Sequence, residues 1–306
     1  MIKFFLVFFL YVTSLHVFAK TEEDYFVQGL LAEDSKNYRE ALKFYTMGAE
    51  LGDGLSQYNL GLLYLEGKGV NQDYKQAFKW FKLAAEQGDI GAQYYLASMY
   101  LEGKGTLRNY AQAEKWYITL SEQGRVGAMQ KLCSMYLYGK GVSQDYKKAF
   151  NWCKQSAEKG MQVPQNDLGI MYQYGYFVKQ DWEKAFEWYM ASAEQGYDEA
   201  QYHIGIIYDF GYGVSQDHKQ AIKWYKQAAE QGHAKAQSHL AMLHINGNGT
   251  IQDNVYGHMW LNISGSNGNK EAIQDRDILA LRMTKEQIAE AQKLARECVA
   301  KEYMSC

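Results

Sequence analysis

A glycine recurs every 36 residues along most of this chain, and that period restricts the possible folds more than any other feature. The series is Gly52, Gly88, Gly124, Gly160, Gly196, Gly232 and Gly268. An aromatic residue keeps the same phase at Phe44, Trp80, Trp116, Trp152, Trp188, Trp224 and Trp260. A fixed period of this length indicates stacked structural repeats, in which each unit buries its apolar face against its neighbours.

Each repeat unit has the pattern of two helices joined by a short loop. In the unit after Gly52, the first helix would bury Leu60, Leu63 and Tyr64 on one face. Glycines at 67 and 69 would end it, because glycine readily adopts the left-handed conformation. The second helix would begin after Asp73 as N-cap, with Gln76 three residues on as in a capping box. Its buried stripe would be Ala77, Trp80, Phe81 and Ala84.

The repeated motifs resemble those of the Sel-one-like repeat (SLR), a branch of the tetratricopeptide-repeat (TPR) superfamily. They read A-x-x-x-L-G-x-x-Y, then G-x-G-V-x-Q-D-Y, then A-x-x-W-x-x-x-A-A-E-Q-G, and extend over roughly residues 22–270. The resemblance implies an all-α fold, a right-handed superhelical solenoid of antiparallel helix pairs. It also implies an adaptor that binds other proteins.

The two ends and the fifth unit depart from this pattern. The first unit, 22–52, lacks the glycine loop and has the shorter turn of a TPR-like cap. In the fifth unit Pro164 stands near a helix start and Phe177 replaces the second loop glycine, so we expect a local irregularity there. We therefore expect a solenoid of about seven helix pairs over 20–270. Residues 271–306 would form a capping helix and tail, with a capping box at Thr284 and Gln287.

The first 19 residues are typical of a secretory signal peptide. Lys3 precedes an apolar run, and small residues lead to a predicted cleavage after Ala19. The alternative, an uncleaved membrane anchor, is less favoured because the apolar run is shorter than the ~20 residues that span a bilayer. We therefore expect a periplasmic or secreted protein with no membrane span after signal cleavage.

Four cysteines, at positions 133, 153, 298 and 306, would permit two disulfides in an oxidising compartment. Three pairings are possible from the sequence. Cys298 and Cys306 could close a short loop, and Cys133 and Cys153 lie on the two predicted helices of the fourth unit. Buried free thiols are the alternative.

Motifs for catalysis or cofactor binding are weak. The G-K-G loops lack the spacing of a phosphate-binding loop. Ser156 and Lys159 match the S-x-x-K motif of penicillin-binding enzymes, but its companion motifs are missing. His203 and His239 occupy one repeat position and could hold a metal with Asp209, although solvated surface histidines are favoured. We expect no cofactor and no metal. With a formal charge of -3 and no basic face, we expect no nucleic acid either.

The TPR-type resemblance places two rows of variable residues in the concave groove, on the first helix of each unit. One row contains Tyr58, Tyr94 and Tyr202, together with Gln130, Asn166 and Ser238. The other contains Glu66, Glu102, Tyr138, Tyr174 and Phe210, together with Asn246. Exposed aromatics often dominate binding hot spots, although tyrosines that merely pack on neighbouring units would look the same.

These observations favour an exported adaptor that binds a protein or peptide in its groove without catalysis. Two alternatives stay open: an envelope enzyme acting on β-lactams or peptidoglycan through Ser156, or a dedicated inhibitor or partner of one toxin or secretion component. The oligomeric state is not predicted.

Overall fold

The computed structural model describes residues 22–304 and 306. Over this part of the chain it consists of helices joined by turns and loops, and it contains no strand. The predicted all-α class is thus confirmed. The helices are α2 (Glu22–Asp34), α3 (Tyr38–Glu50), α4 (Gly54–Glu66), α5 (Tyr74–Glu86), α6 (Ile90–Glu102), α7 (Tyr110–Glu122), α8 (Val126–Tyr138), α9 (Tyr146–Ala157), α10 (Gln162–Tyr174), α11 (Trp182–Ala193), α12 (Asp198–Phe210), α13 (His218–Glu230), α14 (Ala234–Asn246), α15 (Asn254–Ser266), α16 (Lys270–Ala280) and α17 (Lys285–Ala300).

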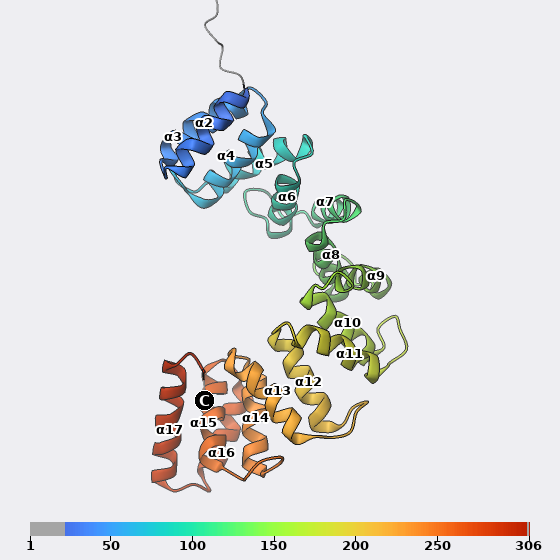
Figure 1. Ribbon diagram of the computed structural model, residues 1–306, viewed down its shortest axis with the longest axis vertical. Coiled ribbons are helices and arrows are strands. Elements are labelled where there is room, and N and C mark those ends of the chain that lie inside the picture. The colour runs from blue at the N-terminus through green and yellow to red at the C-terminus, as the bar shows by residue number, and fades with distance from the viewer. Residues whose placement is uncertain (1–21, 305) are drawn as a thin grey trace, which may run out of the picture. The chain divides into compact units, whose positions relative to one another are not determined.

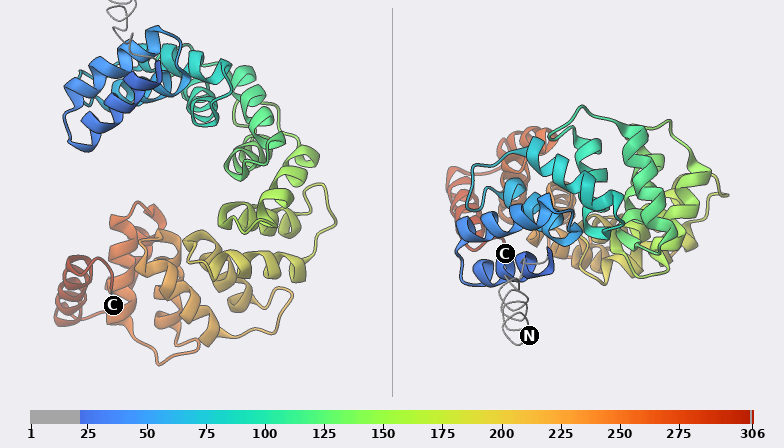
Figure 2. Two further views of the ribbon diagram at one scale, coloured as in Figure 1. Left: turned by 45° about the horizontal axis from the view of Figure 1, so that its top comes forward. Right: turned by 90° about the horizontal axis from the view of Figure 1, so that it is seen from above.

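The chain divides into two compact units, Met1–Ala128 and Met129–Cys306. We call these the first and second units of the chain, and we call each 36-residue repeat a helix pair. The first helix of a pair is its A helix and the second is its B helix. From α4 to α15 every A helix begins 36 residues after the preceding one. In the second unit, α12 to α15 form successive stacked pairs (Figures 1 and 2).

The loop between the two helices of a pair is fixed by glycine at its start and aspartate at its end. Gly67 ends α4 with φ 71°, and its N–H donates to the carbonyl of Leu63. Asp73 caps α5 by accepting from the N–H groups of Lys75 and Gln76. The second loop glycine also lies against the preceding pair: a Cβ on Gly105 would sit 1.9 Å from the carbonyl oxygen of Tyr74. That position therefore needs glycine for both its φ and its close contact.

The core of several pairs contains a glycine of the A helix that faces an aromatic ring of the B helix. A Cβ on Gly205 would lie 2.4 Å from the Tyr225 ring, and Gly169 is equally close to Tyr189. Glycine therefore allows the two helices to approach, as is usual for close helix packing. In the pair α8/α9 the same two positions hold Cys133 and Cys153, which the structure joins in a disulfide. A covalent bond thus replaces the glycine–ring contact seen in α10/α11 and α12/α13.

Buried glutamines link consecutive pairs. The side-chain amide of Gln201 donates to the carbonyl of Ala193, which ends the preceding B helix. Its oxygen accepts from Gln231 at the end of the following B helix. The same bonds join Gln57 to Ala49 and to Gln87. These contacts satisfy carbonyls that a helix end leaves without an intrahelical partner.

The prediction of a local irregularity in the fifth pair, α10/α11, is wrong. Phe177 adopts φ 66°, close to the φ of 70° at the equivalent Gly213, so the loop keeps its conformation despite the missing glycine. Its ring packs 5.7 Å from that of Phe150. Pro164 lies in the first turn of α10, where proline costs little. A non-glycine residue at positive φ costs about 1–2 kcal/mol. The loop bears this strain at Phe177, and the flanking helices keep the 36-residue spacing.

The carboxyl end contains two helices where the sequence indicated one. α16 begins in phase with the A helices, and α17 follows after a four-residue turn. Both pack on α15, and α17 carries the predicted capping box at Thr284 and Gln287. A disulfide joins Cys298 to Cys306.

The predicted signal peptide, 1–19, lies outside the described residues. Within the part of the chain that the structure describes, no helix combines the length and apolar character that a membrane crossing requires.

Candidate protein-binding surface

Three consecutive A helices of the second unit end on an exposed aromatic residue. Tyr138 closes α8, Tyr174 closes α10 and Phe210 closes α12, with 47%, 58% and 53% of their surface exposed. We call these three residues the aromatic row. In the first unit the same position holds Glu66 and Glu102, which are also exposed. The repeat thus changes its surface chemistry at this position from acidic to aromatic.

The residue two positions after the end of each A helix lies beside these side chains. In the first unit Lys68 and Lys104 form ion pairs of 2.6 Å with Glu66 and Glu102. Such exposed pairs neutralise each other and contribute little stability.

In the second unit the partners of the aromatic row are different. Lys140 lies 5.2 Å from the centre of the Tyr138 ring. The rings of Tyr176 and Tyr212 stack on those of Tyr174 and Phe210, at 5.5 and 5.6 Å. The end of the A helix therefore carries an ion pair in the first unit, and in the second unit it carries an aromatic ring that is covered by a lysine at Tyr138 and by a tyrosine ring at Tyr174 and Phe210.

The stacks at α10 and α12 continue into a third ring. Tyr146 stacks on Tyr176 at 4.4 Å, and Trp182 stacks on Tyr212 at 4.5 Å. Offset stacking of this kind restricts ring motion. Each stack therefore offers a preformed aromatic surface, and binding to it would cost little side-chain entropy.

The other predicted row lies between helices. The ring of Tyr58 packs against Gly91 at the start of α6, where a Cβ would lie 2.8 Å away, and it also contacts Phe81 and Tyr95. Tyr94 packs in the same way against Gly127 and Tyr117.

Tyr202 is only 8% exposed, and Asn166 is also buried. Burial raises the pKa of Tyr202 to about 12. Gln130 and Ser238 are half-buried. The tyrosines of this row hold successive A helices together, and they offer less surface than the aromatic row.

A buried carboxylate lies under the first residue of the aromatic row. The hydroxyl of Tyr138 donates to Asp167 Oδ1 at 2.6 Å. The other carboxylate oxygen, Oδ2, lies 3.3 Å from the Cys133 sulfur. Burial raises the pKa of Asp167 to about 6, although the bond from Tyr138 and the charge of Lys140 oppose that rise. Sequence analysis missed this residue.

The histidines do not form the solvated pair that the sequence favoured. His203 is largely buried and stacks on Tyr189 at 4.5 Å, and burial lowers its pKa to about 4. Asp209 accepts from the Tyr225 hydroxyl at 3.3 Å and lies 3.0 Å from His218 Nδ1. These contacts account for buried polar groups within the core.

The described residues include one group of three potential metal ligands whose ligand atoms converge, and it contains no histidine. It comprises Cys133, Cys153 and Asp167. The two sulfurs are bonded to each other, so they are not thiolate ligands in this structure.

The serine of the S-x-x-K match is inaccessible. Ser156 is completely buried in α9, and its hydroxyl donates to the carbonyl of Trp152 at 2.8 Å. A nucleophile must reach its substrate and lie beside a base. Ser156 meets neither requirement in this structure.

Comparisons with known proteins agree with this architecture. Sel1 repeats match residues 28–53, 54–89, 90–124, 126–161, 165–197, 198–233 and 234–269. Among solved structures, a protective antigen present in uropathogenic Escherichia coli strains, with an SLR fold, is 32% identical with a TM-score of 0.77. The match covers 92% of this chain and 61% of that one.

A Sel1 repeat protein from Oxalobacter formigenes is 30% identical with a TM-score of 0.68, over 79% of this chain and 96% of that one. A putative sel1-like repeat-containing protein of Acanthamoeba polyphaga mimivirus is 39% identical over 70 residues, 21% of this chain and 13% of that protein. The chain thus spans about three-fifths of the E. coli antigen and a small part of the viral protein.

Proposed function

The chain belongs to the Sel1 repeat family, and from that premise we propose that it is an exported scaffold that binds a protein or peptide on its aromatic row and catalyses no reaction. The repeat fold is generally one of protein–protein interaction. Our proposal adds to this that the aromatic row is the binding surface and that the protein is exported.

The observation that carries the proposal is the exposure of Tyr138, Tyr174 and Phe210 at one repeat position on three consecutive A helices. Large apolar rings are costly to leave in water, and a contiguous exposed apolar surface often marks an interaction site. Tyrosine and phenylalanine are also enriched at interface centres, where rigid rings give contact area at low entropic cost.

Export is supported by two separate features. The sequence of residues 1–19 has the charge and apolar pattern of a signal peptide. All four cysteines of the chain are paired in disulfides, and structural disulfides persist mainly in oxidising compartments.

The test is a comparison of four immobilised baits incubated with the same bacterial envelope extract. One bait is the native chain, and one carries Tyr174→Ala and Phe210→Ala. A third carries Tyr138→Phe, which keeps the exposed ring. The matched control carries Leu107→Ala and Ile251→Ala, which remove apolar side chains that are 88% and 87% exposed in loops outside the row. Circular dichroism would check that all four baits keep their helicity.

We expect the native and control baits to capture the same partner, and Tyr174→Ala/Phe210→Ala to lose it by at least about tenfold. Tyr138→Phe should keep most of the binding. Equal capture by the native bait and the row variant would exclude the aromatic row as the binding surface. Processing is tested separately, by mass spectrometry of the exported chain: a mature protein that begins at Met1 would contradict signal cleavage.

A further inference from the structure

A tyrosine fills the space between successive A helices in several pairs. Tyr58 fills it between α4 and α6, and Tyr94 fills the equivalent space against Gly127 at the start of α8. Tyr202 fills it between α12 and α14, where its ring stacks on His233 at 4.7 Å. The space between successive A helices therefore accommodates a tyrosine ring.

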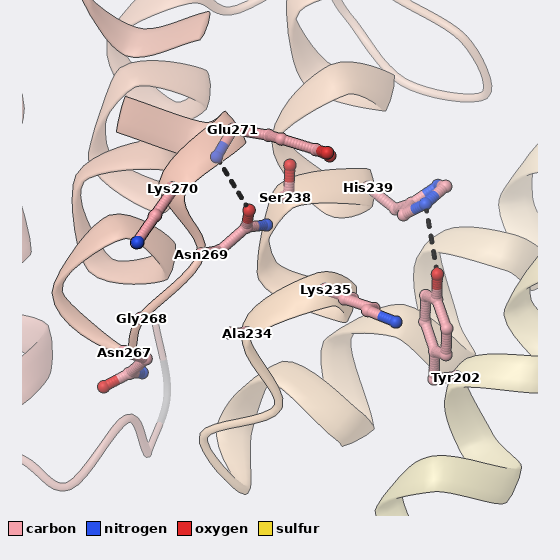
Figure 3. A pocket seen from close by; sticks show the side chains of 10 residues that line it. All are labelled: Tyr202, Ala234, Lys235, Ser238, His239, Asn267, Gly268, Asn269, Lys270 and Glu271. Carbon is pink, nitrogen blue, oxygen red and sulfur yellow. Dashed lines mark hydrogen bonds between the residues drawn. The ribbon is translucent and has the colours of Figure 1, made fainter. Parts of the chain in front are cut away.

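Between α14 and α16 that tyrosine is missing. Ser238 occupies the position of Tyr58, Tyr94 and Tyr202, and a pocket of about 580 Å³ opens beside it. Figure 3 shows Ser238 on α14 facing Asn269 and Glu271 at the start of α16, whereas His239 points away from them, toward the Tyr202 hydroxyl at 3.3 Å. The volume lies within the range of ligand-binding pockets.

The neighbouring positions leave the space open as well. Tyr58 packs on Phe81 and Tyr95. The equivalent positions around Ser238 hold Leu261 and Asp275, and neither carries an aromatic ring. Within the part of the chain that the structure describes, neither of these two positions therefore supplies a ring in place of the absent tyrosine.

The charges at the pocket favour an acidic ligand sequence. Lys235 and Lys270 line it from two helices, and Glu271 is the one acidic residue in the lining. Both lysines are exposed, and neither has an ion-pair partner among the residues that the structure describes. Burial lowers the pKa of His239, so this ring is neutral at pH 7. The lining therefore carries a net positive charge, which an acidic partner would complement.

We propose that this pocket binds the aromatic side chain of a tyrosine that is flanked by acidic residues in a partner polypeptide. The partner's ring takes the space that Tyr58, Tyr94 and Tyr202 fill elsewhere, and its acidic neighbours lie near Lys235 and Lys270. The site is distinct from the aromatic row, so it does not depend on the function proposed above.

The test uses saturation-transfer NMR on the full mature chain with three capped tripeptides: Ac-Glu-Tyr-Glu-NH₂, Ac-Glu-Ala-Glu-NH₂ and Ac-Lys-Tyr-Lys-NH₂. The key variant is Ser238→Tyr, which introduces the side chain that Tyr202 carries at the same repeat position, and circular dichroism would check that the variant keeps its helicity. The matched control is Gln130→Tyr, at the same repeat position in another pair. A third variant, Tyr174→Ala/Phe210→Ala, removes the aromatic row.

We expect transfer to the tyrosine ring protons of the Glu-Tyr-Glu peptide with the native chain. Ser238→Tyr should reduce it at least about tenfold, because its own ring fills the pocket. Gln130→Tyr and the row variant should retain it, and this retention separates the pocket from the proposed function. Equal binding of the Glu-Ala-Glu or Lys-Tyr-Lys peptide, or unchanged binding by Ser238→Tyr, would overturn the proposal.

Discussion

The hydroxyl of Tyr138 donates a 2.6 Å hydrogen bond to the buried carboxylate of Asp167, 29 residues further along the chain. The bond connects the end of α8 to the middle of α10. It fixes an exposed ring of the aromatic row over a buried charge. Surface and core are therefore energetically linked at this point.

Removing that hydroxyl should destabilise the second unit in a pH-dependent way. Tyr138→Phe leaves Asp167 buried without its tyrosine donor, and we expect a loss of about 1–3 kcal/mol in unfolding free energy at pH 7.5. The loss should be smaller at pH 5, where Asp167 is largely protonated because its pKa is about 6. Urea unfolding at both pH values measures this. Tyr174→Phe, whose hydroxyl is exposed, is the control, and an equal loss in both variants would contradict the role given to Asp167.

Asp167 and His203 should give opposite pH dependences in the acidic range. The raised pKa of Asp167, about 6 against an ordinary 3.8, means that the folded chain binds this proton more tightly than the unfolded chain. Its contribution to stability therefore grows as the pH falls from 6 to 4, by about 2 kcal/mol. The lowered pKa of His203, about 4 against 6.5, acts in reverse, and stability falls over the same interval by a similar amount.

In the native chain these two contributions offset each other. Asp167→Asn should expose the acid-sensitive slope of His203, and His203→Gln should expose the opposite slope. The measurement is the unfolding free energy of each variant relative to the native chain from pH 4 to 6.5. Parallel curves for all three proteins would show that neither group changes its pKa on folding.

The second loop glycine should be far less tolerant of alanine than the glycine that ends a pair. Gly105 and Gly88 both have positive φ, 72° and 94°, so alanine costs about 1–2 kcal/mol at either position. At Gly105 the added Cβ would also meet the Tyr74 carbonyl, whereas at Gly88 it would meet nothing within 4 Å. We expect Gly105→Ala to cost about 1–3 kcal/mol more than Gly88→Ala, as measured by urea unfolding. Equal costs would mean that the loop can move away from α5.

The disulfide of the α8/α9 pair should be replaceable by the residues that other pairs use. Cys133→Ala with Cys153→Ala should lower the unfolding free energy by about 2–4 kcal/mol, since it removes a cross-link and leaves a cavity. Cys133→Gly with Cys153→Tyr restores the contact seen at Gly169 and Tyr189, so it should recover part of that loss. Thermal unfolding with and without a reductant compares the two variants. If the glycine–tyrosine variant is less stable than the double alanine variant, then the space beside Asp167 does not accommodate a tyrosine ring at position 153.

Sequence periodicity was sufficient for most of the fold, because each helix start and loop depends on residues that recur in phase. The 36-residue glycine series and Asp73 mark boundaries that local backbone chemistry decides. The irregularity predicted at Phe177 was wrong because the sequence does not show that this ring packs on Phe150 of the preceding B helix. That packing holds the loop in place although Phe177 has a positive φ. The α16 helix was missed because it lacks the loop glycines and carries few buried residues.

The candidate surface was less predictable, for a geometric reason. Tyr202 and Phe210 lie on one helix, and both are variable between repeats, but only the packing of α14 decides that Tyr202 is buried and Phe210 is not. Asp167 gave one unused signal: it holds the same repeat position as His203 and His239. Three titratable residues in phase already indicated a polar layer beneath the surface, although not its hydrogen bonds.

The glutamine contacts between pairs have a consequence for how such a chain can change its length. Gln57 and Gln201 form the same bonds to the pair before and the pair after, so pairs that carry this glutamine offer their neighbours the same ends, whereas α8 has Met129 at this position. Duplication of a 36-residue block that carries these glutamines would recreate the junctions without any compensating substitution. The gene for such an array can therefore lengthen or shorten in steps of one block, while the terminal helices α16 and α17 are inherited unchanged.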